Sequence, residues 1–341
     1  MDINVMNTGS AIDWLTDSID LDSPAMLWGS PGIGKSQLAR AVQSIKSDQT
    51  GDDWNLIDFR AVLRDPVDMR GVPVPDLESG TVRMLPVGEL PDETRDGKYG
   101  ILLLDEINAA PNAMQVACYG LVLDRQVGEY RLPSNWRIIA CGNRQSDRAG
   151  ASRMNSALAD RFDHATLEPD LDSWCKWALA NGIAAELISF LRFRPELFND
   201  FNADRIINVT PRSWARVSDL LNAKLPADRE MRQLQGKVGD GPACELAAFL
   251  KIFRTLPNPD AVLMNPASCD VPNEPAALYA ISGALARKVT ESTIGNMIEY
   301  LNRIPVEYAV MAIKDAIGRH KVLASTPEFV AWQVANSDVY V

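Results

Sequence analysis

The chain has 341 residues, 46% of them hydrophobic and 23% charged, which is the composition of a globular protein with one to three domains and not of a disordered one. Its 45 acidic and 34 basic residues give a net charge of −11, which argues mildly against DNA as the main ligand but leaves room for a local basic groove. Five scattered cysteines and two histidines argue against both a disulfide framework and a structural zinc site.

The N-terminal segment, residues 1–15, has no basic start and no long apolar run, so it does not resemble a secretory signal. No stretch of the sequence reaches the apolar length of a membrane span. We therefore expect a cytoplasmic protein in reducing surroundings.

Short apolar runs in the first half of the chain predict strands that are buried on both faces of a parallel sheet. Five such runs occur, at 25–28, 54–57, 101–104, 136–140 and 164–167. Helical patterns separate them: apolar residues recur at helical spacing after Lys35, and Pro111 suits the first turn of a later helix. Strands that alternate with helices predict a doubly wound α/β domain, which we place at residues 1–168.

Two segments interrupt this alternation. Residues 65–91 are rich in proline and place a turn at 78–80 between two short runs, 72–74 and 81–85, which predicts an inserted β-hairpin. Residues 126–133 predict a second, shorter hairpin just before the fourth strand.

Strand patterns stop at about residue 171, and the remainder predicts helices separated by turns rich in proline and asparagine. We expect a helical lid at 169–225 and an all-α C-terminal extension at 226–341. The clearest helical patterns in the extension are 244–253, 275–286, 292–301 and 305–317.

The first apolar run ends in a glycine-rich loop that fits the P-loop pattern G-x-x-x-x-G-K-[ST]. Backbone N–H groups of such a loop wrap phosphate oxygens, and the helix that follows directs its positive dipole end at the same anion. The lysine reaches the outer phosphates, and the hydroxyl that follows it ligates Mg²⁺. The predicted nucleotide-binding residues are Gly29, Ser30, Pro31, Gly32, Ile33, Gly34, Lys35 and Ser36, with Ser36 also a metal ligand.

Two carboxylates, Asp105 and Glu106, follow the third apolar run. Adjacent residues on a strand point to opposite faces, so we expect the two to have different roles. Asp105 would hold the Mg²⁺ ion and its water, and Glu106 would act as the general base toward the attacking water. Asn143, at the end of the fourth run, is placed to touch the terminal phosphate or its water, although Gly142 and Asn143 also suit a simple turn.

Several motifs, in this order and spacing, resemble AAA+ ATPases of the MoxR-like branch. The resemblance covers about residues 20–225 and is carried by GSPGIGKS (29–36), RDPVDMRGVP (64–73), LLLDEINAAPNAMQ (102–115), VGEYRLPSNW (127–136), CGNR (141–144), LADRFD (158–163) and TPRSWARV (210–217).

The resemblance implies further site residues. Asn143 takes the sensor-1 position, Arg161 takes the position of the arginine finger that acts on a neighbouring subunit, and Arg212 takes the sensor-2 position on the lid. An arginine supplied in this way neutralises charge on the transferred phosphoryl group. One departure is Ala109, where relatives often carry an arginine. The arginines that compete with Arg161 for the finger role are Arg144, Arg148 and Arg153.

The resemblance also implies an ATP- and Mg²⁺-dependent enzyme that forms a homo-hexamer and remodels a protein client. A partner with a von Willebrand factor A domain often accompanies this branch, and the two hairpins would face the pore or the client. Alternatives are a nucleic-acid motor, which the acidic charge disfavours, and a nucleotide-gated scaffold, against which the intact carboxylates argue. A P-loop contacts phosphates and not the base, so GTP also stays open as the substrate.

Overall fold

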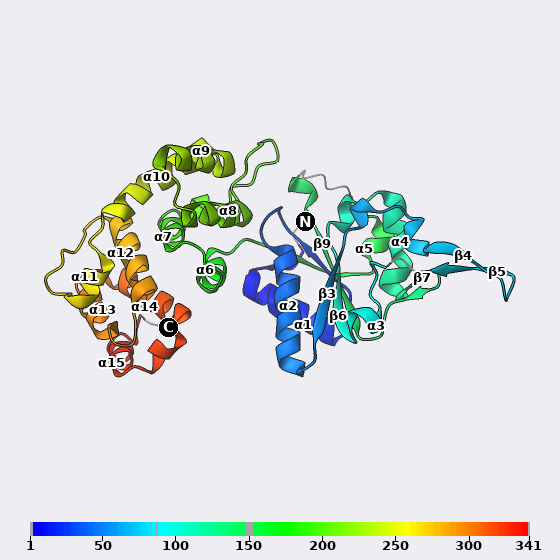
Figure 1. The fold of residues 1–341 in the computed structure, drawn as a ribbon, viewed down its shortest axis with the longest axis horizontal. Coiled ribbons are helices and arrows are strands. Elements are labelled where there is room, and N and C mark those ends of the chain that lie inside the picture. Colours follow the sequence, from blue (N-terminus) through cyan, green and yellow to red (C-terminus); the bar gives the residue numbers. More distant parts are fainter. Residues whose placement is uncertain (1–2, 86–87, 148–152, 340–341) are drawn as a thin grey trace. The chain divides into compact units, whose positions relative to one another are not determined.

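The computed structural model describes residues 3–85, 88–147 and 153–339. The chain divides into two compact units (Figure 1). The first, the α/β unit, contains residues 1–170 and 201–204, and the second, the helical unit, contains residues 171–200 and 205–341.

A six-stranded sheet forms the centre of the α/β unit, and all of its neighbouring strands run parallel. In spatial order the strands are β1 (Val5–Met6), β10 (Asp163–Leu167), β2 (Ala25–Trp28), β9 (Trp136–Gly142), β6 (Tyr99–Leu104) and β3 (Trp54–Phe59). The five predicted runs are therefore confirmed, and β1 is an additional strand that the sequence analysis missed.

Helices cover both faces of this sheet. Alternate residues of β6 show the two faces: Ile101 and Leu103 pack in one apolar cluster, and Leu102 and Leu104 pack in another. The first face is covered by α1 (Thr8–Asp20) and α2 (Lys35–Thr50), and the second by α4 (Asn112–Leu123) and α5 (Ser156–Ala159). This confirms the doubly wound α/β arrangement.

Both predicted hairpins are present in the α/β unit. Strands β4 (Val72–Asp76) and β5 (Thr81–Leu85) pair antiparallel, with Val72 opposite Leu85, and extend outward from the unit in Figure 1. The shorter hairpin consists of β7 (Gln126–Val127) and β8 (Tyr130–Arg131). A short helix, α3 (Glu93–Asp96), lies between the first hairpin and β6.

The helical unit contains two apolar clusters. Its helices are α6 (Leu171–Ala180), α7 (Ala185–Phe193), α8 (Pro211–Asn222), α9 (Ala227–Val238), α10 (Asp240–Thr255), α11 (Pro259–Met264), α12 (Pro275–Lys288), α13 (Ile294–Leu301), α14 (Val306–Arg319) and α15 (Pro327–Ala335). The first cluster contains residues from helices α6 through α10, and the second contains residues from helices α11 through α15. Helix α12 contributes residues to both clusters. The chain thus has the expected α/β P-loop fold with a helical C-terminal part.

The predicted boundary between lid and extension, at residue 226, falls inside the first of these clusters. Trp214 and Leu234, which lie on opposite sides of that residue, belong to the same cluster. The division at residue 226, like the boundary at 168, stays a prediction. Within the described part of the chain, no helix combines the length and apolarity that crossing a membrane requires.

Candidate functional site

Three neighbouring strands of the sheet carry the predicted site residues at their carboxyl ends. The P-loop follows β2, Asn143 follows β9 and Asp105 follows β6. Because β9 lies between β2 and β6, all three chain segments meet at one edge of the sheet. In open α/β sheets, ligands bind at this edge, where consecutive strands of the chain are not neighbours in the sheet.

The backbone of the P-loop depends on its glycines. Gly32 and Gly34 have φ angles of +80° and +104°, a region that side-chain-bearing residues rarely adopt. A Cβ atom on Gly29 would lie 2.9 Å from the carbonyl oxygen of Leu167, so only glycine fits there without a backbone shift. A Cβ atom on Gly34 would meet nothing within 4 Å, so its positive φ, and not a lack of space, favours glycine there.

Lys35, the first residue of α2, is only 8% exposed. Its ammonium donates to the carbonyl oxygens of Gly29 and Ser30, at 2.7 and 3.0 Å, and to Asn143 Oδ1, at 2.9 Å. The lysine therefore joins the P-loop to the end of β9. The structure thus brings Lys35 and Asn143 together, as their predicted roles require.

Ser36 and Asp105 also meet across the site. The Ser36 hydroxyl donates to Asp105 Oδ2 at 2.8 Å, and Asp105 is 8% exposed. Hydroxyl and carboxylate oxygens are ligands that suit Mg²⁺, which usually takes one or two protein ligands and completes its shell with phosphates and water. The described residues contain no group of three or more His, Cys, Asp or Glu side chains suited to a metal. A Mg²⁺ ion held by Ser36 and Asp105 would complete its shell with phosphate and water.

Glu106 differs from Asp105 in its backbone. Strand β6 ends at Leu104, and Glu106 has φ 55° and ψ 32°, a left-handed conformation that is uncommon for glutamate. Its side chain is exposed, whereas that of Asp105 is buried. The two carboxylates are thus separated, as expected. The cause is the left-handed backbone of Glu106, and the expected cause, alternation along a strand, is wrong because β6 ends before both residues.

Asn108 is a buried residue of the site that the sequence analysis did not identify. It is 1% exposed, donates from Nδ2 to the carbonyl oxygen of Asn143 at 2.8 Å, and accepts at Oδ1 from the Asn143 N–H at 3.2 Å. A Cβ atom on Gly142 would lie 2.6 Å from Asn108 Oδ1. Asn108 therefore fixes the backbone of Asn143. The feature of the sequence that could have identified Asn108 as a site residue is its position three residues after Asp105.

Arg144, one of the predicted competitors of Arg161, contacts the P-loop directly. Its Nη2 donates to Ser30 Oγ at 2.7 Å, and its Nε lies 3.3 Å from Asp147 Oδ2. Arg148, the second competitor, lies outside the described residues.

Arg161 and Arg212 lie in different units of the molecule. Arg161 donates to the carbonyl oxygen of Ala157, and its guanidinium lies 4.9 Å from the ring centre of Tyr119 on α4. Arg212 is exposed and is the second residue of α8 in the helical unit. Their roles as finger and sensor stay predictions. Ala109 is half-buried in the turn Ile107–Ala109.

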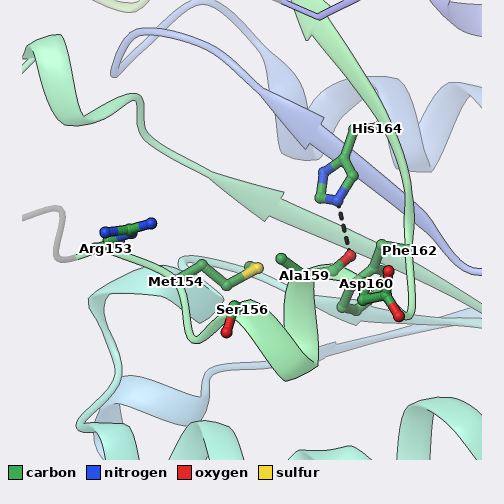
Figure 2. Close-up of a pocket in the computed structure, with 7 residues that line it drawn as sticks. All are labelled: Arg153, Met154, Ser156, Ala159, Asp160, Phe162 and His164. Atoms are coloured by element: carbon green, nitrogen blue, oxygen red, sulfur yellow. Dashed lines mark hydrogen bonds between the residues drawn. The ribbon is translucent and has the colours of Figure 1, made fainter. Parts of the chain in front are cut away.

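A depression of about 440 Å³ lies beside α5 and β10, on the second face of the sheet (Figure 2). Arg153, the third competitor, lies at its border, and His164 lies on the β10 side. His164 donates from Nε2 to the carbonyl oxygen of Ala159 at 2.8 Å and accepts at Nδ1 from Trp28 Nε1 at 2.9 Å. These bonds orient the ring and link β10 to the residue preceding the P-loop.

No protein-family model matches the chain, and no curated protein sequence matches it. Among solved structures, NtrX from Brucella abortus in complex with ADP is 18% identical, with a TM-score of 0.41 over 98% of this chain and 68% of that one. Domain III of the replication initiation protein DnaA from Thermotoga maritima is 18% identical, with a TM-score of 0.38 over 70% of this chain and 90% of that one.

Hsp104, solved with ATPγS and casein, is 16% identical, with a TM-score of 0.38. That similarity covers 72% of this chain but only 46% of the Hsp104 chain. At these identities and scores the similarities carry no argument about activity. The function therefore has to be inferred from the side chains of the site.

Proposed function

We propose that the protein is an AAA+ nucleoside-triphosphate hydrolase, with ATP as its substrate and Mg²⁺ as its cofactor. The observation that supports this best is the convergence of four groups at the carboxyl edge of the sheet. Lys35 Nζ lies 2.9 Å from Asn143 Oδ1, and Ser36 Oγ lies 2.8 Å from Asp105 Oδ2. A lysine, a hydroxyl, a carboxylate and an amide, all at the carboxyl ends of three adjacent strands, match the needs of a bound triphosphate.

The P-loop and α2 would bind the phosphates. Backbone N–H groups between Gly29 and Ser36 would surround the β-phosphate, helped by the positive end of α2. Lys35 would exchange its carbonyl partners for outer phosphate oxygens, because a hydrogen bond to a charged acceptor is about twice as strong as one to a neutral acceptor.

Ser36 and Asp105 would hold Mg²⁺, which neutralises charge on the phosphates when bound. Glu106, which is exposed and has a left-handed backbone, would accept a proton from the attacking water. The water oxygen then bonds to the γ-phosphorus, and the bond between that phosphorus and the bridging oxygen breaks, which leaves a diphosphate and inorganic phosphate. Asn143 would orient the water or the terminal phosphate.

The resemblance to the MoxR-like branch supports a more specific proposal. The chain would form a ring, with six copies as the expected number, and would use hydrolysis to remodel a protein client. A partner with a von Willebrand factor A domain would link the ring to this client. Arg161 would act on the nucleotide of a neighbouring copy, and Arg212 on that of its own copy. The two hairpins, β4–β5 and β7–β8, are the elements we assign to the client.

The experiment that tests the proposed function compares Glu106→Gln with the unaltered protein. We expect the variant to bind MgATP with unchanged affinity, because the amide keeps the size of the side chain, and to turn over about 10²- to 10⁴-fold more slowly, the usual contribution of a general base. Binding is measured by calorimetry and turnover by phosphate release.

The matched control is Glu93→Gln, which removes an exposed carboxylate on α3 and should leave turnover unchanged. Normal turnover by Glu106→Gln would remove the catalytic assignment. Absence of binding heat with every purine triphosphate in the presence of magnesium would remove the proposed function altogether.

A further inference from the structure

Arg144 brings a second cation to the P-loop. It directly follows Asn143, after the end of β9, and its guanidinium lies between two buried partners. Ser30, 3% exposed, accepts from Nη2 at 2.7 Å, and Asp147, 8% exposed, lies 3.3 Å from Nε. The guanidinium is therefore held against the P-loop by the turn Gln145–Asp147.

The position of Arg144 relative to the phosphates follows from Lys35. In a P-loop the lysine marks the outer phosphates. The Lys35 ammonium lies 3.0 Å from the carbonyl oxygen of Ser30, and Arg144 donates to the hydroxyl of this same residue. Asn143, the chain neighbour of Arg144, also contacts the ammonium. Both cations thus meet at Ser30, on the outer-phosphate side of the loop.

The chemistry of the guanidinium favours phosphate over its present hydroxyl partner. The Arg144 side chain keeps 25% of its surface exposed, so it is accessible to a ligand. A guanidinium presents several donors in a planar fork that matches phosphate oxygens. Bonds to a charged oxygen are about twice as strong as bonds to a neutral hydroxyl, so a nearby terminal phosphate would compete successfully with Ser30.

We propose that Arg144 binds the terminal phosphate of a triphosphate held by the same chain, and that it donates to Ser30 when this phosphate is absent. A diphosphate lacks the group that Arg144 would bind. The residue therefore makes the site prefer triphosphate to diphosphate. This inference rests on the proposed function. It adds to that function a cation that the sequence analysis named only as a competitor of Arg161 for the finger role.

The test compares ATP with ADP in a Glu106→Gln background, where hydrolysis does not disturb the titration. Each magnesium nucleotide is titrated by calorimetry into the full chain. We expect Arg144→Gln to weaken ATP binding about 10- to 100-fold, the effect of losing a hydrogen bond to a charged group, and to weaken ADP binding less than about threefold. Arg144→Lys should recover part of the loss for ATP, because it keeps the charge but not the fork.

Ser30→Ala separates the two ways in which Arg144 could act. If Arg144 binds the phosphate, Ser30→Ala keeps the preference for ATP over ADP. If Arg144 only supports the loop through Ser30, both substitutions weaken ATP and ADP equally, and this result would overturn the proposal. Arg131→Gln, which removes an exposed cation from β8, controls for the change in net charge and should alter neither affinity.

Folding of the variants needs its own control, because Arg144→Gln leaves the buried Asp147 without this cation. The double variant Arg144→Gln/Asp147→Asn removes both charges and should show the same selective loss of ATP affinity. Equal ATP and ADP losses in the double variant would also overturn the proposal. If the Glu106→Gln parent binds neither nucleotide, the proposed function itself fails. If the parent binds both nucleotides and Arg144→Gln does not change either affinity, only the proposal about Arg144 fails.

Discussion

Buried charges occur in both units, and their partners differ in kind. In the α/β unit, the buried Lys35 bonds to two backbone carbonyls and to the amide of Asn143, all of them neutral acceptors. In the helical unit, the buried Asp315 on α14 accepts from both terminal nitrogens of Arg192 on α7. The ammonium bonds to carbonyl and amide oxygens at the P-loop and the end of β9, whereas the carboxylate and guanidinium of the other pair match each other in charge and shape.

This difference indicates which charges are available to a ligand. The carbonyl oxygens of Gly29 and Ser30 are neutral acceptors, so charged phosphate oxygens can replace them at Lys35 with a gain in energy. A bidentate pair such as that of Arg192 and Asp315 is complete without a ligand. We therefore expect substitutions at the pair of Arg192 and Asp315 to affect stability, and those at the sheet edge to affect nucleotide affinity.

The largest effect is expected for Asp315→Ala. Removal of one partner leaves the Arg192 guanidinium, 17% exposed, without its counter-charge. The loss of one partner of such a pair typically lowers the free energy of unfolding by about 3–5 kcal/mol. Urea denaturation followed by circular dichroism should show this loss, while the affinity for MgATP, measured under folding conditions, stays unchanged.

The matched variant for this prediction replaces both partners. Arg192→Met/Asp315→Leu removes the two charges together, and pairs of this kind are often replaced by apolar residues at little or no cost. If Asp315→Ala lowers the free energy of unfolding by no more than the double variant does, the view that Arg192 and Asp315 compensate each other's charge would be contradicted.

An intermediate effect is expected for Lys35→Ala. The substitution removes hydrogen bonds to charged phosphate, so MgATP affinity should fall about 10- to 100-fold, whereas the unfolding transition of the helical unit should not move. Calorimetric titration measures the first quantity, and circular dichroism measures the second.

Lys46 provides the control for this prediction, because it is a second buried lysine on the same helix. It is 5% exposed and bonds to Asp20 Oδ1 at 2.5 Å, so its charge is already compensated. Lys46→Ala should lower stability and leave affinity unchanged. Equal losses of affinity in the two variants would mean that substitution in α2 disturbs the site in general, and that Lys35 has no special role.

Much of the α/β architecture was predictable because its signals are local. Strands covered on both faces need continuous apolar runs such as 101–104, and the P-loop pattern requires glycine wherever φ is positive, as at Gly34. Strand β1 was missed because two residues, one of them the half-exposed Val5, are too few for a periodic pattern.

The missing parts of the site depend on contacts between distant segments. Arg144 meets Ser30, 114 positions earlier in the chain, because β9 pairs with β2 in a register that places Gly142 opposite Trp28. No periodicity within either segment specifies that register. The left-handed backbone of Glu106 is likewise a conformation for which its residue type gives no signal.

The smallest effect is expected for the cap of α8, the helix that carries Arg212. The Thr210 hydroxyl accepts from the Ser213 N–H at 3.3 Å, and Ser213 Oγ accepts from the Thr210 N–H at 2.9 Å, which satisfies donors on both sides of the helix start. Thr210→Ala should lower the free energy of unfolding by about 1 kcal/mol, or the melting temperature of a unit of this size by about 2–4 °C, while Thr210→Ser keeps the cap and most of the stability.

The same two variants also test the role of Arg212 through their MgATP affinity. If α8 only packs, both variants keep this affinity. If Arg212 acts on nucleotide, Thr210→Ala also lowers that affinity, because a frayed first turn no longer positions the second residue of the helix. The MgATP affinity of Thr210→Ala therefore distinguishes an α8 that positions Arg212 for the nucleotide from an α8 that only packs.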